Sequence, residues 1–201
     1  MQQYLLSYEA QNEALLRSLR GIYETSFPPD ERRRFEDVVR IASSEQAFHV
    51  DIYTESGETV GFIMYWNFEK FVYAEHFAVL EKYRGNGYGS TIIRSLLNRL
   101  ALPLLLEVEK PEDETSARRI RFYEKLGLKL SAVPYRQPPY SADKNSVPMC
   151  LMSYGDIDLS KRFDEVRNVL YAKVYGISQN ASASNFLGNF QNRNNVPDNL
   201  L

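Results

Sequence analysis

A run of glycines between an apolar segment and an amphipathic segment constrains this chain more than any other feature. The run is Tyr83-Arg84-Gly85-Asn86-Gly87-Tyr88-Gly89-Ser90, with three glycines in five positions. It follows the strand-like segment 71–80 and precedes a segment with apolar residues at helical spacing. Glycine allows positive φ and a close approach of a ligand to the backbone, and the first N–H groups of a helix have no partner inside it. The junction therefore predicts an anion site that suits a pyrophosphate.

The spacing of these glycines excludes two common phosphate-binding motifs. A dinucleotide fingerprint needs Gly-x-Gly-x-x-Gly and an acidic residue about twenty positions later, and a P-loop needs Gly-Lys-Ser/Thr. The pattern here is Arg-x-x-Gly-x-Gly, on Arg84, Gly87 and Gly89. It resembles the acyl-CoA pyrophosphate loop of the GNAT N-acetyltransferases.

A second block of residues supports the same resemblance. The sequence from Phe122 to Leu128, Phe-Tyr-Glu-Lys-Leu-Gly-Leu, is similar to the Phe-Tyr-x-x-x-Gly-Phe block of that family, with Leu128 in the last place. The order and separation of the two blocks also fit the family. The resemblance covers roughly residues 1–155.

Composition sets broad limits on function. A chain of 201 residues is long enough for one domain with a sizeable core. The net charge of −2 argues against a nucleic-acid partner. The single cysteine, Cys150, fits a reducing compartment. With neither a transmembrane-length apolar stretch nor a signal-peptide pattern, we expect a cytoplasmic protein without a membrane partner.

The spacing of apolar residues predicts a mixed α/β domain. Strands are expected at about 3–7, 47–54, 59–68, 71–80, 104–109, 128–134 and 147–154, with a Pro-rich loop at 135–140 before the last. Helices are expected at about 9–25, 88–101 and 114–126, and another is expected to begin at Pro28-Pro29-Asp30-Glu31 and to expose Arg32, Arg33 and Arg34 to solvent. The sheet should be antiparallel first and parallel later.

The resemblance implies the GNAT fold, with a central sheet of about seven strands flanked by helices. We divide the chain into an acyltransferase domain at 1–155, a C-terminal helix at 156–177 and an Asn/Ser-rich tail at 178–201. The last helix and the tail are candidates for a homodimer contact.

The resemblance also implies that acetyl-CoA is the cosubstrate and that no metal takes part. The loop would bind the pyrophosphate through its N–H groups, and the strand end at 77–79 would pair with the pantetheine arm. The Val79 N–H would face the thioester oxygen. Many members have an asparagine at the place of Ser116, so that contact falls to Thr115 or Ser116, or is lost. The implied cofactor-binding residues are Phe77, Ala78, Val79, Arg84, Gly85, Asn86, Gly87, Tyr88, Gly89, Ser90 and Ser116.

Tyr123 is the candidate general acid, because the family places a tyrosine there to protonate the leaving thiolate. A thiol has a pKa near 8.5 and tyrosine near 10, so full proton transfer is uphill by about 1.5 units.

Glu107 and Glu75 are the candidate bases, and a proton relayed by water is a third option. Glu107 ends a strand where the ribosomal-protein branch of the family has a glutamate. Glu75 shares strand parity with Phe77 and Val79, which would turn it toward the cofactor and His76 away from it. Burial in apolar strands should raise the pKa of both carboxyls, unless an arginine such as Arg118 or Arg121 pairs with one of them.

The sequence therefore predicts an N-acetyltransferase that moves an acetyl group from acetyl-CoA to a primary amine by direct attack in a ternary complex. A noncatalytic acyl-CoA-binding module of the same fold is the alternative, and a phosphate binder unrelated to CoA is a third. The acceptor, a small-molecule or a protein or peptide amine, is not encoded in any motif. Four aromatic residues could line its site: Tyr65, Trp66, Tyr135 and Tyr140.

Overall fold

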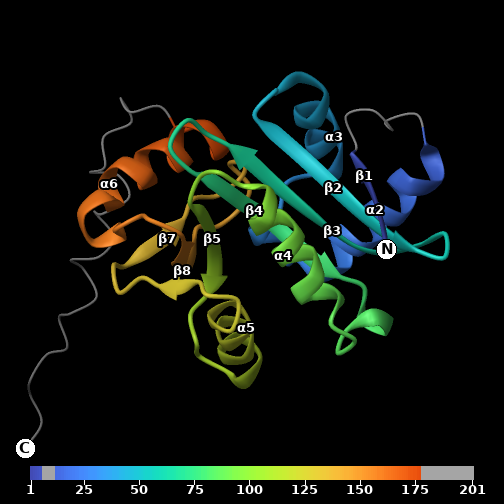
Figure 1. The fold of residues 1–201 in the computed structure, drawn as a ribbon. Coiled ribbons are helices and arrows are strands. Elements are labelled where there is room, and N and C mark those ends of the chain that lie inside the picture. The colour runs from blue at the N-terminus through green and yellow to red at the C-terminus, as the bar shows by residue number, and fades with distance from the viewer. Residues whose placement is uncertain (6–11, 178–201) are drawn as a thin grey trace, which may run out of the picture. The chain divides into compact units, whose positions relative to one another are not determined.

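The computed structural model describes residues 1–5 and 12–177, and the chain divides into two compact units. The first unit, Met1–Arg162, is built on one eight-stranded sheet (Figure 1). The second unit starts at Phe163, within helix α6 (Leu159–Val169), and includes the π-helical turn Leu170–Val174. The predicted tail at 178–201 lies outside the described residues, and the domain boundaries remain predictions.

The sheet has the strand order β1-β2-β3-β4-β5-β8-β6, and β7 also pairs with β8. Among the described strands, only β4 and β5 are parallel. The parallel part is smaller than predicted because β8 inserts between β5 and β6 and runs antiparallel to both. The strands are β1 (Gln2–Leu5), β2 (Phe48–Glu55), β3 (Glu58–Asn67), β4 (Val72–Val79), β5 (Leu104–Glu109), β6 (Lys129–Leu130), β7 (Tyr135–Gln137) and β8 (Val147–Tyr154). Strand β7 is the one that the sequence did not predict.

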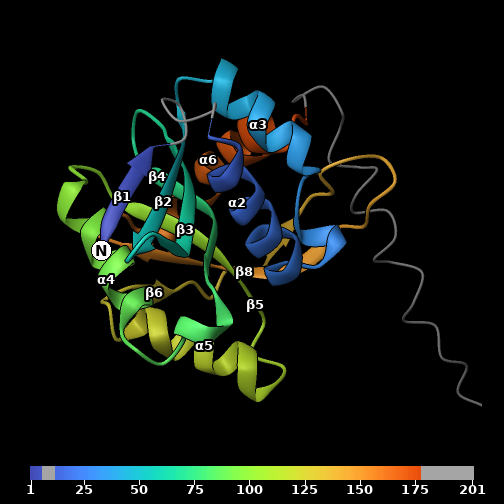
Figure 2. The same cartoon turned by 90° about the vertical axis from the view of Figure 1, so that its right-hand side faces the viewer.

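Two pairs of helices cover the faces of the sheet. Helices α2 (Glu13–Ser26) and α3 (Phe35–Ser44) lie on one face, and α4 (Tyr88–Arg99) and α5 (Glu114–Glu124) lie on the other (Figures 1 and 2). Side chains fix two helix starts: Asn12 accepts a hydrogen bond from the Leu15 N–H, and Asp113 forms a capping box with Ser116.

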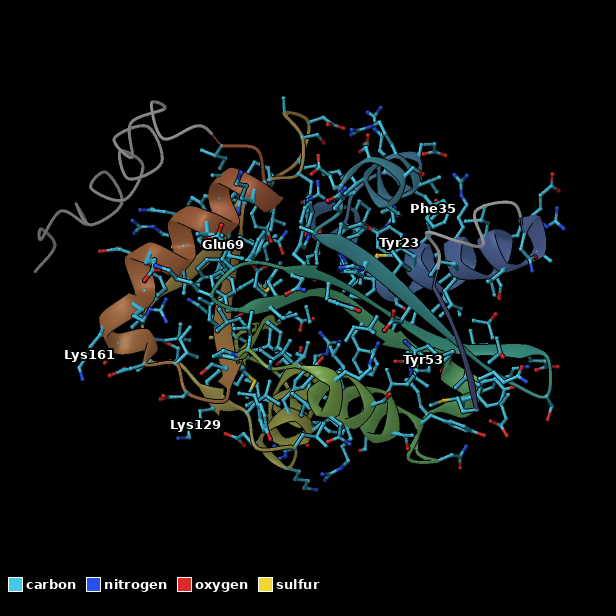
Figure 3. The ribbon with its side chains drawn as sticks, turned by 45° about the horizontal axis from the view of Figure 1, so that its top comes forward. Tyr23, Phe35, Tyr53, Glu69, Lys129 and Lys161 are labelled. Atoms are coloured by element: carbon cyan, nitrogen blue, oxygen red, sulfur yellow. The ribbon has the colours of Figure 1, made fainter. Side chains whose placement is uncertain are left out.

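The apolar residues form a layer on each face of the sheet. On the α4–α5 face, Ile92 and Ile93 pack with alternate residues of β5, including Leu106. On the α2–α3 face, the ring of Tyr23 packs against Phe35 and Phe62. Figure 3 labels Tyr23 and Phe35 among the helices of that face. The sheet is thus buried on both sides.

The segment between α2 and α3 differs from the prediction. Pro29–Glu31 is a short 3-10 helix (η1), Arg32 is extended with φ −140° and ψ 155°, and α3 begins only at Phe35. The Arg33 N–H donates to the Tyr23 hydroxyl at 2.8 Å, which holds the backbone out of a helix. The side chain of Arg33 is only 12% exposed, so the prediction of a solvated arginine face was wrong for this residue.

Strand β4 contains a β-bulge at Glu75. His76 is opposite Met64 and Ala74 is opposite Tyr65, so Glu75 is an extra residue in the ladder. The extra residue reverses the facing of the side chains after it, and Phe77 consequently packs with Ala74 on the α4–α5 face. The prediction that Glu75 shares a face with Phe77, opposite His76, was therefore wrong.

Candidate active site

A cleft opens in the sheet where β4 and β5 separate. Their parallel pairing ends at Ala74 and Leu106, and the described residues show no pairing between the two strands beyond that point. The cleft has a volume of about 730 Å³. Its walls come from the end of β4, the glycine loop, the end of β5 and the face of α5. Backbone groups at the open edges of the two strands are available to an extended ligand.

The backbone of Val79 faces this open edge. The Leu80 N–H donates to the carbonyl of Val60 in β3, at 2.8 Å. Successive residues of a strand direct their N–H and C=O groups to opposite edges, so those of Val79 point away from β3. Arg84 Nε reaches the Val79 carbonyl at 3.0 Å, which agrees with this direction. The Val79 N–H thus points to the open edge of β4, and its role toward a thioester stays a prediction.

The glycine loop leads directly into α4. Gly85 and Gly87 both have φ +81°, and Gly87 is the N-cap of α4, without a side-chain cap. A Cβ built on Gly87 would meet no atom within 4 Å, whereas one on Gly89 would contact the rings of Phe122 and Phe77 at 3.5 and 3.6 Å. The open space and unpaired N–H groups at Gly87 fit a phosphate.

Most of the predicted cofactor-binding residues line the cleft, and three do not. Asn86 and Tyr88 are outside its lining, although they belong to the same loop. Ser116 is also outside, and its Oγ accepts from the Asp113 N–H at 3.1 Å within the capping box of α5. The neighbouring Thr115 does line the cleft, and it is therefore the better candidate for the lost asparagine contact.

Tyr123 lies in the cleft wall and is only 6% exposed. Burial raises the pKa of its hydroxyl, so the side chain is protonated at neutral pH and can donate a hydrogen bond. Full proton transfer to a thiolate is therefore more costly than the sequence suggested.

Glu107 lies on the opposite side of the cleft and is held by β7. The Tyr135 hydroxyl donates to its Oε1 at 2.5 Å. Strand alternation turns Glu107 away from Leu106 and Val108, which belong to the apolar layer on the α4–α5 face. Its carboxylate thus faces the other side of the sheet, away from the α4–α5 layer.

Glu75 is held in a buried ion pair. Its carboxylate is 1% exposed and accepts from Arg33 Nε at 2.8 Å and from Trp66 Nε1 at 2.6 Å. Burial raises the pKa of Glu75, but Arg33, His76 and Trp66 outweigh it, so the pKa is lowered. The prediction of a raised pKa was wrong for Glu75. Its partner Arg33 lies 42 positions away in the sequence, and no local pattern indicated the ion pair.

The four aromatic residues proposed for the acceptor site do not line the cleft. Trp66 and Tyr135 instead donate to Glu75 and Glu107, Tyr65 stacks on His49, and Tyr140 lies under the guanidinium of Arg33 at 4.7 Å. Trp66 and Tyr135 thus hold the two carboxylates by hydrogen bonds and do not face the cleft themselves.

Sequence reasoning missed several residues of the cleft. Glu31 of η1 and Gln137 of β7 line it, and so does Glu109, which pairs with Arg119. Sequence motifs gave no signal for Glu31 and Gln137, since each reaches the cleft through the packing of distant segments. The cationic residues Arg118 and Arg121 of α5 and Lys125 at its C-cap follow helical spacing, which was a usable signal.

No helix in 1–5 and 12–177 is long and apolar enough to cross a membrane. Within the same ranges, no three histidine, cysteine or acidic residues gather as a metal site.

Comparison with known proteins decides the family. The model of the Acetyltransferase (GNAT) family matches residues 12–128, more than half of the chain. The chain belongs to the GNAT family of acetyltransferases. The fold agrees, since a solved GNAT structure from Bacteroides thetaiotaomicron, provisionally named an acetyltransferase, superposes with a TM-score of 0.81. It is 33% identical, and the match covers 89% of this chain and 100% of that one.

Other GNAT relatives are more distant or match less of the chain. YjbC of Bacillus subtilis (strain 168), provisionally named an acetyltransferase, is 32% identical over 90 residues, which are 43% of this chain and 46% of YjbC. The match thus spans about half the length of that relative. An aminoglycoside 6'-N-acetyltransferase complexed with coenzyme A is 17% identical with a TM-score of 0.58, and covers 79% of this chain and 98% of its own. At that identity the likeness shows the GNAT fold alone.

We predict that Glu75→Gln lowers the free energy of unfolding at pH 7 by about 3 kcal/mol, because it leaves the buried Arg33 without its charge partner. The folded pKa of Glu75 is lowered from 4.5, so its stabilising effect is present above about pH 4.5 and is lost as the pH falls through the folded pKa. Urea unfolding at several pH values should show the difference from wild type shrinking in acid.

The control variant is Glu36→Gln, whose carboxylate is 67% exposed and pairs with Arg20. It should cost less than about 1 kcal/mol at every pH. A wild-type stability for Glu75→Gln at pH 7 would contradict the structural role of this ion pair.

Proposed function

We propose that this GNAT protein transfers an acetyl group from acetyl-CoA to a primary amine by direct attack in a ternary complex. The observation that carries the proposal is the glycine loop at the mouth of a cleft where, among the described residues, the facing edges of β4 and β5 no longer pair. The loop suits the pyrophosphate and the strand edge suits the pantetheine arm. The cosubstrate and the amine would then enter the cleft from opposite faces of the sheet.

The residues around the cleft support each chemical need of the reaction. The amine nitrogen attacks the thioester carbon, and the Val79 N–H would stabilise the negative charge that develops on the carbonyl oxygen. Glu107 would accept the amine proton, directly or through water, because its carboxylate faces the acceptor side and Glu75 is held in its ion pair. Tyr123 would donate a hydrogen bond to the sulfur as the C–S bond breaks.

The alternative of a noncatalytic acyl-CoA-binding module needs the loop but neither Tyr123 nor Glu107. Both residues line the same cleft as the loop, and they belong to opposite faces of the sheet. That arrangement favours an enzyme.

We predict that CoA binds the folded protein and that Gly87→Val abolishes this binding. A ligand at a hundred times its dissociation constant should stabilise the fold by about 2.7 kcal/mol, which thermal unfolding detects. The variant would place branched carbons in the open space at a φ of +81°.

Gly57→Val is a matched control for Gly87→Val. Gly57 has φ +83°, also without neighbours within 4 Å, and it lies in the β2–β3 hairpin outside the cleft. It should cost similar strain and leave the CoA affinity unchanged. Equal CoA affinity in the two variants would place the phosphates elsewhere.

We predict that Tyr123→Phe lowers kcat about a hundredfold while the affinity for acetyl-CoA stays near wild type, because only the donor hydroxyl is removed. Steady-state kinetics with an accepted amine and calorimetry with CoA measure the two effects. Tyr154→Phe, on an exposed ring outside the cleft, is the control. Wild-type turnover in Tyr123→Phe would leave this residue with a packing role only.

We predict that Glu107→Gln removes the acidic limb of the pH–rate profile and lowers kcat about a hundredfold. Gln keeps the size of the side chain but cannot accept a proton. Tyr135→Phe should instead keep the limb and move it to higher pH, because its hydroxyl donates to the charged carboxylate at 2.5 Å. An unchanged profile in Glu107→Gln would favour an amine that arrives neutral.

A further inference from the structure

The two sides of the cleft carry opposite charge. On the side of the glycine loop and α5, its lining includes Arg84, Arg118, Arg121 and Lys125. On the side formed by η1 and by Glu75 of β4 and the end of β5, its lining includes Glu31, Glu75, Glu107 and Glu109. The cationic side fits the phosphates of CoA. The acidic side is then the side of the acceptor, and its charge bears on what the acceptor can be.

Cations of the protein offset only part of this acidic side. Arg33 pairs with Glu75, and Arg119 pairs with Glu109. The carboxylate of Glu31 has no ion pair or hydrogen bond to any residue in 1–5 and 12–177. An excess of negative charge therefore faces the acceptor.

The backbone around Glu31 is held in place from two directions. His76, which is 3% exposed, lies with Nε2 at 2.9 Å from the Glu31 carbonyl, to which it donates. Gln137 Nε2 donates to the Asp30 carbonyl at 3.3 Å, and Asn145 binds the Asp30 carboxylate through its N–H and its side-chain amide. The short helix η1 is thus fixed against β4, β7 and the loop before β8. With its backbone fixed, Glu31 has only its side chain to order when a ligand binds.

The carboxylate of Glu31 is also electrostatically unsatisfied. Burial and the negative charge of Glu109 raise the pKa of Glu31, and Arg119 offsets this only in part. A bound cation would oppose both effects and lower the pKa of Glu31, because an opposite charge favours the ionised carboxylate.

We propose that the acceptor is an amine with a second positive charge, and that Glu31 binds this second charge while the reacting nitrogen lies at Glu107. The inference rests on the proposed function and names its substrate class. A proton of the reacting nitrogen passes to Glu107, and the C–N bond forms as the C–S bond of acetyl-CoA breaks. The leaving thiolate accepts a hydrogen bond from Tyr123 and takes its proton from water. The second ammonium stays charged throughout.

Pairs of amines with equal chain length test this directly. Putrescine is compared with n-butylamine, and cadaverine with n-pentylamine, by the release of the CoA thiol from acetyl-CoA. We expect kcat/KM to favour each diamine by about tenfold or more, equivalent to about 1.4 kcal/mol. In Glu31→Gln this preference should fall toward one, through KM for the diamine, with kcat and the KM for acetyl-CoA unchanged.

The control is Glu112→Gln, which removes the same charge from an exposed position outside the cleft. It should keep the wild-type preference. Titration of putrescine into the CoA-saturated protein adds a readout that needs no turnover, and we expect binding that weakens in Glu31→Gln and at high salt.

Several outcomes would overturn the inference. They are equal or better use of the monoamines, an unchanged diamine preference in Glu31→Gln, and neither binding nor turnover of any diamine by a protein that binds CoA. If CoA itself does not bind, the proposed function fails together with the inference. The two failures are thus distinguishable.

Discussion

The buried carboxylate of Glu75 needs a charge partner and hydrogen-bond donors, and segments around the cleft provide them. A carboxylate that is 1% exposed must have partners, and it finds Arg33 from the α2–α3 connection and Trp66 from β3. Arg33 lies in the extended segment after η1, where the Tyr23 hydroxyl also accepts a hydrogen bond from its N–H. Glu31, the last residue of η1, lies in the wall of the cleft. One ion pair therefore links the middle of the sheet to the side on which an acceptor would bind.

The sequence predicts the parts of the fold that depend on local patterns. Most strands and helices are within a few residues of their expected bounds, and the glycine loop precedes α4 as its residues indicate. Local pattern fails where distant contacts decide the backbone. The Tyr23 hydroxyl, ten residues away, accepts a hydrogen bond from the N–H of Arg33. Strand β8 inserts between β5 and β6. Strand β7 forms against β8 in a region that Pro residues mark as a loop.

The site was predictable to a similar degree. Motifs locate the loop, the strand end and Tyr123, since each is a contiguous run of residues. They cannot locate Arg33 and Tyr135, which fix the two candidate glutamates from 42 and 28 positions away. The choice between those glutamates therefore needs the tertiary structure. The four aromatic residues chosen for the acceptor show the same limit, because an aromatic side chain in a strand gives no indication of which neighbour its polar atom will find.

The bulge in β4 gives the cleft a property that substitutions cannot reveal. Side chains along a strand alternate between its two faces. The extra residue at Glu75 therefore reverses the facing of every side chain that follows it in β4. A substitution leaves this alternation unchanged. Removing one residue between Ala74 and Val79 would instead turn the side chains of Phe77 and Val79 to the other face of the sheet and their N–H groups to the other edge of the strand. Insertions and deletions in β4 should therefore be far more harmful than its point mutations. For anyone redesigning this protein, the length of this strand is part of the binding site.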